Sequence, residues 1–134
     1  MAKRQVDAGH VRPLPPYFAI KRVYDEVDAK DGFRVLVDRL WPRGISRDKA
    51  HVDLWLKELA PSDALRHWFA HEPAKWSAFV ERYRAELQAN EGAIGAFEAE
   101  LTKHAHVTLL YAARDEEYNN ALALLAYVLR RRVA

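Results

Sequence analysis

The sequence contains no cysteine among its 134 residues. Without thiols, the protein has no disulfide bonds, thiolate nucleophiles, sulfur-based zinc sites or iron–sulfur clusters. No apolar run is long enough to cross a bilayer, and the polar N-terminal residues lack the apolar stretch of a secretory signal. We therefore expect a cytoplasmic protein that does not associate with membranes.

The sequence also lacks an excess of charge of one sign. Its 21 lysines and arginines nearly balance 19 aspartates and glutamates, which leaves a net charge of +2. Dedicated nucleic-acid-binding proteins usually carry a larger excess or concentrate it on one face. Half of the residues are hydrophobic, as in ordinary globular domains, and the length suits one domain with its own core.

The chain divides into a short tail and one domain. Residues 1–16 are mostly polar and end in three prolines within four positions. Proline removes a hydrogen-bond donor and fixes φ, which favours an extended segment over packed structure. We predict that residues 1–16 form a flexible N-terminal tail and that residues 17–134 form a single α/β domain.

Three apolar runs are predicted to be strands, at residues 18–24, 33–40 and 107–112. The second is apolar on both faces until its end, which is typical of a central strand covered on both sides. A loop is expected at 41–52, and residues 53–59 fit either a fourth strand or a helical turn.

Helices are expected between the last two of these strands and at the C-terminus. Ser62 is the expected N-cap of the first helix, and Pro73 suits the start of the second. Asn90 is expected to cap a third helix and Asp115 the last one. Strands separated by helices favour a small, mainly parallel sheet flanked by helices, which is an α/β fold.

Polar residues follow two of the predicted strands directly. Since the carboxyl ends of parallel strands share one edge of a sheet, where α/β proteins bind ligands, these residues are expected to converge there. The pattern predicts a pocket for an anion, either a phosphate or a carboxylate. The candidate site residues are Asp38, Arg39, Trp41, Arg43, Gly44, Arg114, Asp115 and Asn119.

Each charged candidate has a functional and a structural interpretation. Arg39, Arg43 and Arg114 are expected to hold the anion, because guanidinium groups form paired hydrogen bonds with phosphate and carboxylate. Asp38 and Asp115 are the catalytic candidates and would orient the arginines or move protons. Alternatively, Asp38 forms a structural ion pair with an arginine, and Asp115 only caps a helix.

The uncharged candidates would complete the pocket. Gly44 would let backbone donors approach the ligand, and Asn119 would add a donor at a helix N-terminus, where anions bind readily. Trp41 lies in a polar loop and could stack on a ring, although packing is the commoner role of tryptophan. Whether a reaction follows binding is left open by the sequence.

Several segments of the chain resemble the YeaO-like family of bacterial proteins, which is domain of unknown function 488. The resemblance covers about residues 18–130. It is carried by residues Ile20–Tyr24, Arg34–Gly44, Leu54–Ser62, Leu65–His71, Leu110–Asp115 and Asn119–Ala121.

The resemblance implies a small, single-domain, cytoplasmic α/β protein whose activity is not established. A related branch of the wider group carries a cysteine and a Cys-His-Arg triplet near the turn that matches residues 112–120. This chain has alanine, arginine, aspartate and asparagine at those positions. Thiol chemistry therefore cannot be transferred to it.

The sequence offers three further interpretations. His67 and His71 are four residues apart, as metal ligands on a helix can be, but no third ligand is evident, and we expect neither a metal nor a cofactor. A nucleic-acid-associated or regulatory role is the alternative function; it would use Trp41 and the basic run Arg130–Arg132. The tail docking a partner is a third possibility, and the oligomeric state is not indicated.

Overall fold

The computed structural model describes residues 16–133. The predicted tail therefore lies outside the described residues, with the exception of Pro16. Pro16 is buried, and its carbonyl oxygen accepts a hydrogen bond from Arg132 Nη1 at 3.2 Å.

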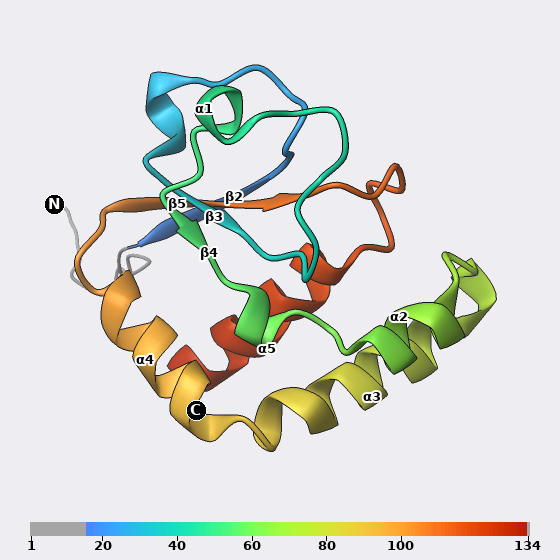
Figure 1. Cartoon of the computed structure of the whole chain (residues 1–134). Coiled ribbons are helices and arrows are strands. Elements are labelled where there is room, and N and C mark those ends of the chain that lie inside the picture. The colour runs from blue at the N-terminus through green and yellow to red at the C-terminus, as the bar shows by residue number, and fades with distance from the viewer. Residues whose placement is uncertain (1–15, 134) are drawn as a thin grey trace, which may run out of the picture.

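A four-stranded sheet forms the centre of the molecule (Figure 1). Its spatial order is β2-β5-β3-β4, and every neighbouring pair is parallel. The prediction of a mainly parallel sheet is confirmed. The strands are β2 (Tyr17–Arg22), β3 (Phe33–Leu36), β4 (Leu54–Trp55) and β5 (His106–Tyr111).

Helices cover both faces of the sheet, but unequally. Four of them lie on one side and a single short helix lies on the other (Figure 1). The larger layer contains α2 (Asp63–Phe69), α3 (Trp76–Gln88), α4 (Glu91–Leu101) and α5 (Asn120–Val133), and the smaller layer contains α1 (Arg47–Ala50). Short 3-10 helices lie at Ala29–Asp31, Lys57–Leu59 and Pro73–Lys75.

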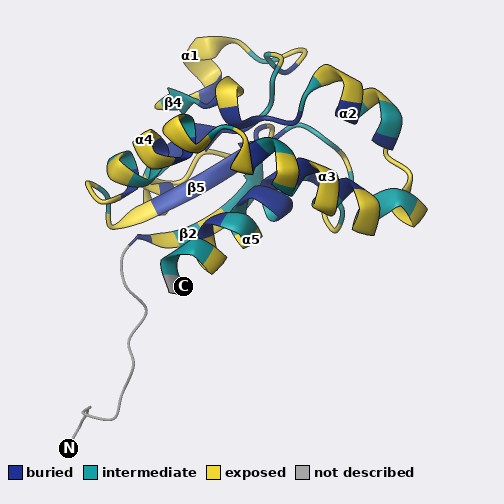
Figure 2. Cartoon of the chain, turned by 90° about the horizontal axis from the view of Figure 1, so that it is seen from below, coloured by how far each residue is buried: buried dark blue, intermediate teal, exposed yellow. Residues whose placement is uncertain are grey.

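The alternation of side chains along the strands produces two apolar clusters. Val35 and Leu109 pack with the larger helical layer, whereas Leu36 and Leu110 pack with Ala50 of α1 on the opposite face. Because successive strand residues point to opposite faces, a strand buried on both sides must be apolar throughout. Strand β5 is buried over residues 107–111 and is apolar there except for Thr108 (Figure 2).

The structure corrects several predicted boundaries. Strand β3 ends at Leu36 rather than at residue 40. The predicted loop at 41–52 contains helix α1, which Ser46 caps by accepting a hydrogen bond from the Lys49 backbone. Residues 53–59 contain both a two-residue strand and a 3-10 turn. The two predicted alternatives for this segment therefore both occur.

The predicted caps of the helices give mixed results. Ser62 accepts a hydrogen bond from the Leu65 backbone, as expected of an N-cap. Asn90 precedes α4, but its side chain donates to the Glu58 carbonyl oxygen instead of capping. Helix α5 begins at Asn120, so the prediction that Asp115 is its N-cap was wrong.

The reason for the last error is a turn that precedes α5. Asp115 Oδ1 accepts hydrogen bonds from the backbone of Glu117 and Tyr118 at 2.8 and 3.0 Å. Aspartate forms such turns readily by bonding to backbone two residues further on. Asn119 Oδ1 then accepts from the Leu122 backbone at 3.0 Å and performs the cap.

No helix within residues 16–133 is long and apolar enough to span a membrane.

Candidate functional site

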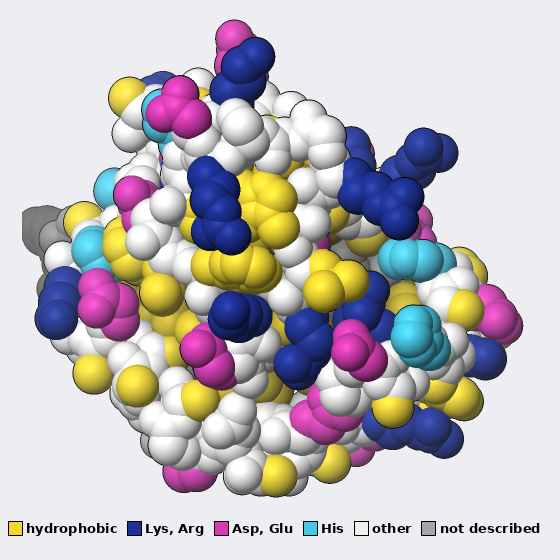
Figure 3. Space-filling view, in the orientation of Figure 1, with side chains coloured by type: hydrophobic (Ala, Val, Ile, Leu, Met, Phe, Trp, Pro, Cys, Tyr) yellow, Lys and Arg dark blue, Asp and Glu magenta, His cyan; other side chains and the backbone are white. Residues whose placement is uncertain are grey.

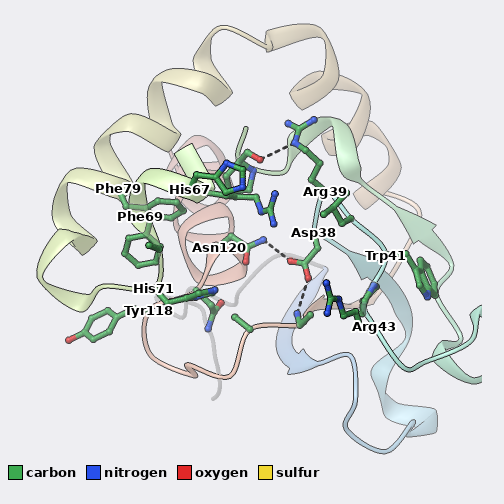
Figure 4. Close-up of a pocket in the computed structure, with 18 of the residues that line it drawn as sticks. Asp38, Arg39, Trp41, Arg43, His67, Phe69, His71, Phe79, Tyr118 and Asn120 are labelled. Atoms are coloured by element: carbon green, nitrogen blue, oxygen red, sulfur yellow. Dashed lines mark hydrogen bonds between the residues drawn. The ribbon is translucent and has the colours of Figure 1, made fainter. Parts of the chain in front are cut away.

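The carboxyl ends of β3 and β5 are joined by Asp38. Its Oδ2 accepts a hydrogen bond from the Ala112 backbone at 2.9 Å, and its Oδ1 accepts one from Asn120 Nδ2 at 3.1 Å (Figure 4). Asn120 Nδ2 also donates to the Val37 carbonyl oxygen at 2.9 Å. The two polar segments singled out in the sequence therefore meet in space.

Asp38 lies in an environment that disfavours its charge. Burial raises the pKa of the Asp38 carboxyl group, although the hydrogen bonds from Asn120 and Ala112 and the charges of Arg66 and His71 work in the opposite direction. Both of its oxygens are already hydrogen-bonded to the protein. This carboxyl group is therefore a structural link between two loops.

A cavity of about 540 Å³ opens beside this link. It lies at the carboxyl edge of the sheet, beyond the ends of β2, β3 and β5, and α2 and α3 form its other side. This volume falls within the range of roughly 300–1,000 Å³ that small-molecule sites occupy. The lining residues come from five parts of the chain: Tyr24, residues 38–43, Pro61 with residues 66–71 except Trp68, Phe79, and residues 112–120 in part.

Five predicted site residues line this cavity: Asp38, Arg39, Trp41, Arg43 and Asn119. Gly44, Arg114 and Asp115 are not among its lining residues. Gly44 has a φ of +77°, and an added Cβ would meet nothing within 4 Å. The left-handed backbone of the turn, rather than a close approach, therefore accounts for glycine at this position.

Arg39 and Trp41 are largely occupied by contacts within the protein. The Arg39 guanidinium donates to the carbonyl oxygens of Pro61 and Ala60 at 3.0 and 3.1 Å. In Figure 4 its side chain extends away from Asp38. Trp41 donates from Nε1 to the Ile45 carbonyl oxygen at 2.7 Å and packs edge-on against Trp55. Both residues hold the loop around the cavity.

Asn119 is similarly engaged, and only 2% of it is exposed. It caps α5 through Oδ1 and donates from Nδ2 to the Asp115 carbonyl oxygen at 3.1 Å. It brings the N-terminal end of α5, where the helix dipole is positive, to the cavity.

Arg43 differs from the other candidates. It is exposed, and within residues 16–133 its guanidinium forms no hydrogen bond or ion pair. Figure 4 shows it beside Asp38. The Tyr24 hydroxyl donates to the Arg43 backbone oxygen at 2.7 Å and so fixes the backbone from which this side chain extends.

Helix α2 and the turn after it contribute basic residues that were not predicted as ligand-binding. Arg66 and His67 of α2 and His71, which lies two residues beyond its end, all line the cavity. The spacing of His67 and His71 indicated only a metal pair, and Arg66 was not among the predicted site residues. Their position at the sheet edge depends on how α2 packs, for which the sequence holds no local signal.

The end of α2 is backbone-strained where it meets the cavity. Ala70 and His71 are consecutive and have φ values of 47° and 56°. The left-handed region costs a non-glycine residue free energy, and such conformations concentrate at functional sites. Here they turn the chain sharply between α2 and α3 while both residues remain in the cavity wall.

Aromatic side chains form the side of the cavity opposite Arg43. Phe69, Phe79 and Tyr118 line it, and Figure 4 shows them grouped on one side, with Asp38 and Arg43 on the other. Trp76 stands behind them, with ring centroids 6.0, 5.5 and 5.4 Å from those of Phe69, Phe79 and Tyr118.

The described residues contain no group of three or more metal-ligating side chains that could hold a metal ion. Nor do the basic residues of α5 form an open cluster. Arg131 is bound to Glu91 and Glu98 at 2.9 and 2.8 Å, and Arg132 contacts Pro16. Figure 3 shows other basic side chains beside histidines on the side of the molecule where α2 lies.

Comparisons with known proteins place the chain in a family. Residues 17–134 match the family described as "Inactive DUF488-N3 subclade". The chain is 45% identical over 104 residues to the uncharacterized protein YeaO of Escherichia coli (strain K12), an overlap of 78% of this chain and 90% of that protein. It is 42% identical over 113 residues to the uncharacterized protein Rv3073c of Mycobacterium tuberculosis (strain ATCC 25618 / H37Rv), an overlap of 84% and 93%.

No solved structure matches the chain. The family match covers nearly the whole chain, and both relatives are similar over most of their own length. The resemblance noted in the sequence is confirmed, and the chain belongs to the YeaO-like DUF488 family.

Proposed function

We propose that this protein binds a small molecule carrying a phosphate or carboxylate group in the cavity at the carboxyl edge of its sheet. We propose further that it holds this molecule without transforming it. The observation that carries the proposal is the unpaired guanidinium of Arg43 at the cavity. Arginine is suited to recognising these groups because its planar fork donates two parallel hydrogen bonds.

The charge around the cavity supports an anionic ligand. Arg43, Arg66, His67 and His71 line the cavity, and Asp38 is its one acidic lining residue among the described residues. Asp38 directs both oxygens to donors of the protein. The positive end of α5 adds to the attraction, because anions are stabilised at helix N-termini.

The lining residues support binding rather than catalysis. None of the described lining residues is serine, threonine, cysteine or lysine, and these side chains supply most nucleophiles in enzymes. Both oxygens of Asp38 accept hydrogen bonds from the protein, which supports a structural role for this carboxyl group. The word "inactive" in the description of the matched family agrees with this proposal.

The proposal is tested by titration calorimetry and thermal shift with inorganic phosphate, acetate, nucleotides and short RNA and DNA. Arg43→Ala is expected to weaken small-anion binding at least tenfold while leaving the melting temperature within about 2 °C, because Arg43 is exposed and its guanidinium forms no hydrogen bond or ion pair within residues 16–133. Arg130→Ala is the matched control, since Arg130 is also exposed but lies on α5 away from the cavity.

Two results would contradict the proposal. One is equal anion binding by the wild type and Arg43→Ala. The other is binding only to nucleic acid, with a steep dependence on salt, which would favour the alternative nucleic-acid-associated role. The internal ion pairs of Arg131 weigh against that alternative.

A further inference from the structure

We propose that the ligand is an anion attached to a flat apolar ring, with its charged group at Arg43 and Arg66 and its ring against Phe69, Phe79 and Tyr118. The inference rests on the proposed function and names the ligand class of the same cavity. It follows from the size of the cavity, from the division of its wall into a basic and an aromatic part, and from the rigidity of the aromatic part.

The cavity is too large for a free phosphate or acetate ion. Its volume is about 540 Å³, whereas a molecule in liquid water occupies about 30 Å³, and these ions are only a few times larger than water. A bare ion held at Arg43 would leave most of the cavity to solvent. Small-molecule sites bury most of their ligand against apolar walls and use a few polar groups for orientation.

The wall combines cationic and apolar groups in this way. Arg43 comes from the loop after β3 and Arg66 from α2, whereas Phe69, Phe79 and Tyr118 come from the end of α2, from α3 and from the turn before α5. Tyr24, Trp41, His67 and His71 also line the cavity. Figure 4 shows Phe69, Phe79 and Tyr118 grouped apart from Asp38 and Arg43. A ligand that satisfies both parts must itself carry charge at one end and an apolar group at the other.

Arg66 is the second cation of the basic part. Its Nη1 is 2.8 Å from Asp63 Oδ1, three residues earlier on α2, and its charge acts to lower the pKa of Asp38. A guanidinium paired with one carboxylate keeps further N–H groups available, because it has five donors in a fixed plane. Arg66 and Arg43 can therefore approach one anionic group, one from helix α2 and the other from the loop after β3.

The aromatic part is rigid, which favours a flat ring over a flexible chain. Phe69 and Phe79 are buried, with 6% and 2% of each exposed, and their ring centroids are 4.5 Å apart. Trp76 supports all three rings of the wall. Aromatic groups prefer offset-stacked or edge-to-face contacts at such distances, so a flat ligand ring would extend an existing stack.

The test compares ligands that differ in one part only, by titration calorimetry on the full-length protein. Phenyl phosphate is compared with inorganic phosphate and with phenol, and benzoate with acetate. We expect the ring-bearing anion of at least one pair to bind at least tenfold more tightly than its bare anion, and phenol to bind at least tenfold more weakly than phenyl phosphate. Binding should also change the fluorescence of Trp76, which a Trp76→Phe variant would remove.

Two variants separate the parts of the wall. Tyr118→Ala should reduce the affinity for the ring-bearing anion several-fold and leave that for the bare anion unchanged, whereas Tyr118→Phe, which keeps the ring, should bind as the wild type does. Arg66→Gln should weaken both ligands. Tyr118 is only partly buried, and the ligand series on the wild type decides the question even if Tyr118→Ala fails to fold.

The outcomes distinguish this inference from the function on which it rests. Equal affinity for ring-bearing and bare anions in both pairs would overturn the inference and leave the anion site in place. Absence of binding by every anion would overturn both. Tight binding of phenol itself would overturn the inference as well, because the charged group would then contribute nothing.

Discussion

Asp38 shows how one side chain can fit two interpretations in the sequence and organise a site in the structure. In the sequence it follows a buried strand and stands beside an arginine, as both a general base and a structural carboxylate can. In the structure it accepts from Ala112 and Asn120 and so ties two distant loops together. Burial disfavours the charged form of this carboxyl group and raises its pKa. The effect on stability can be measured as a function of pH.

The difference in the free energy of unfolding between the wild type and Asp38→Asn should depend on pH. Because burial raises the pKa of Asp38 above its ordinary value of 3.8, the folded protein holds the proton more tightly than the unfolded chain. The wild type therefore loses stability as pH rises from about 3.8 through the raised pKa. Asparagine does not titrate, so the free energy of unfolding of Asp38→Asn should rise relative to that of the wild type over this interval and stay level above it.

Urea denaturation at a series of pH values measures this difference. A constant penalty for Asp38→Asn is expected as well, because the amide cannot accept hydrogen bonds from both Ala112 and Asn120. The opposite result would be a free energy of unfolding of the wild type that rises relative to that of Asp38→Asn as pH increases. It would show that folding stabilises the charged form of Asp38.

Helix α2 is the element on which the site depends most. It has only 7 residues, too few to be stable alone, yet it carries Arg66 and His67. Its start is fixed twice: Ser62 Oγ accepts from the Leu65 backbone at 3.1 Å, and the Ser62 hydroxyl and backbone N–H donate to Glu86 on α3. The N-cap thus sets where the helix begins and also where it stands against α3.

Removing this cap should affect both stability and binding. Ser62→Ala is expected to cost about 1 kcal/mol in the free energy of unfolding, the usual value for a serine N-cap, with a further loss because Glu86 keeps only the backbone N–H of residue 62 and loses the hydroxyl donor. It should also weaken anion binding, since α2 positions Arg66. Denaturation and calorimetry measure the two effects.

Ser46→Ala is the matched control for this variant. Ser46 caps α1 by accepting from the Lys49 backbone at 3.1 Å, but neither α1 nor Ser46 lines the cavity. The Ser46→Ala variant should lose a comparable free energy of unfolding and keep the wild-type affinity for the anion. Equal loss of affinity in both variants would mean that binding follows overall stability rather than the placement of α2.

At the scale of the whole molecule, a buried ionic network links the strands to helix α1 on the smaller helical side of the sheet. Asp31 pairs with Lys21 of β2 at 3.0 Å and with Arg34 of β3. The Asp31 backbone oxygen accepts from Thr108 of β5 at 2.7 Å. Arg34 also donates to the carbonyl oxygens of Ala50 and His51, at the end of α1. Asp31 and Arg34 therefore connect three strands and the smaller helical layer through ion pairs and hydrogen bonds.

Asp31→Ala should destabilise the protein by about 3–5 kcal/mol, because it leaves a buried arginine without its anion; only 3% of Arg34 is exposed. Burial works against the Asp31 carboxylate, but hydrogen bonds from the Asp28 backbone, Lys21 and Arg34 outweigh it and lower its pKa. The stabilisation is therefore present above about pH 3.8 and is lost as pH falls through the lower folded-state pKa.

Chemical denaturation at neutral and acidic pH checks both statements. The matched control is Glu81→Ala, which removes an exposed ion pair with Arg84 on α3 and should cost no more than about 1 kcal/mol. A loss for Asp31→Ala as small as that of the control would show that the network contributes little to stability.

The sequence by itself determined the α/β class, the parallel sheet, most of the helices and the edge where the polar loops gather. These follow from local periodicity, capping residues and the geometry of parallel strands, all of which are encoded over a few neighbouring positions. Its family motifs were also readable directly. The errors lay at element ends, where a side chain such as that of Asp115 can close a turn as readily as cap a helix.

Only the tertiary structure decided which of the basic residues at the cavity keep donors for a ligand. Arg39 and Arg43 are four positions apart in one loop, yet the guanidinium of Arg39 is bound to backbone carbonyl oxygens and that of Arg43 has no hydrogen bond or ion pair within the described residues. Arg66 reaches the same cavity from a helix in a different part of the chain. Local sequence encodes where strands and helices form, but a pocket is made by side chains from separate elements, and their meeting depends on how those elements pack.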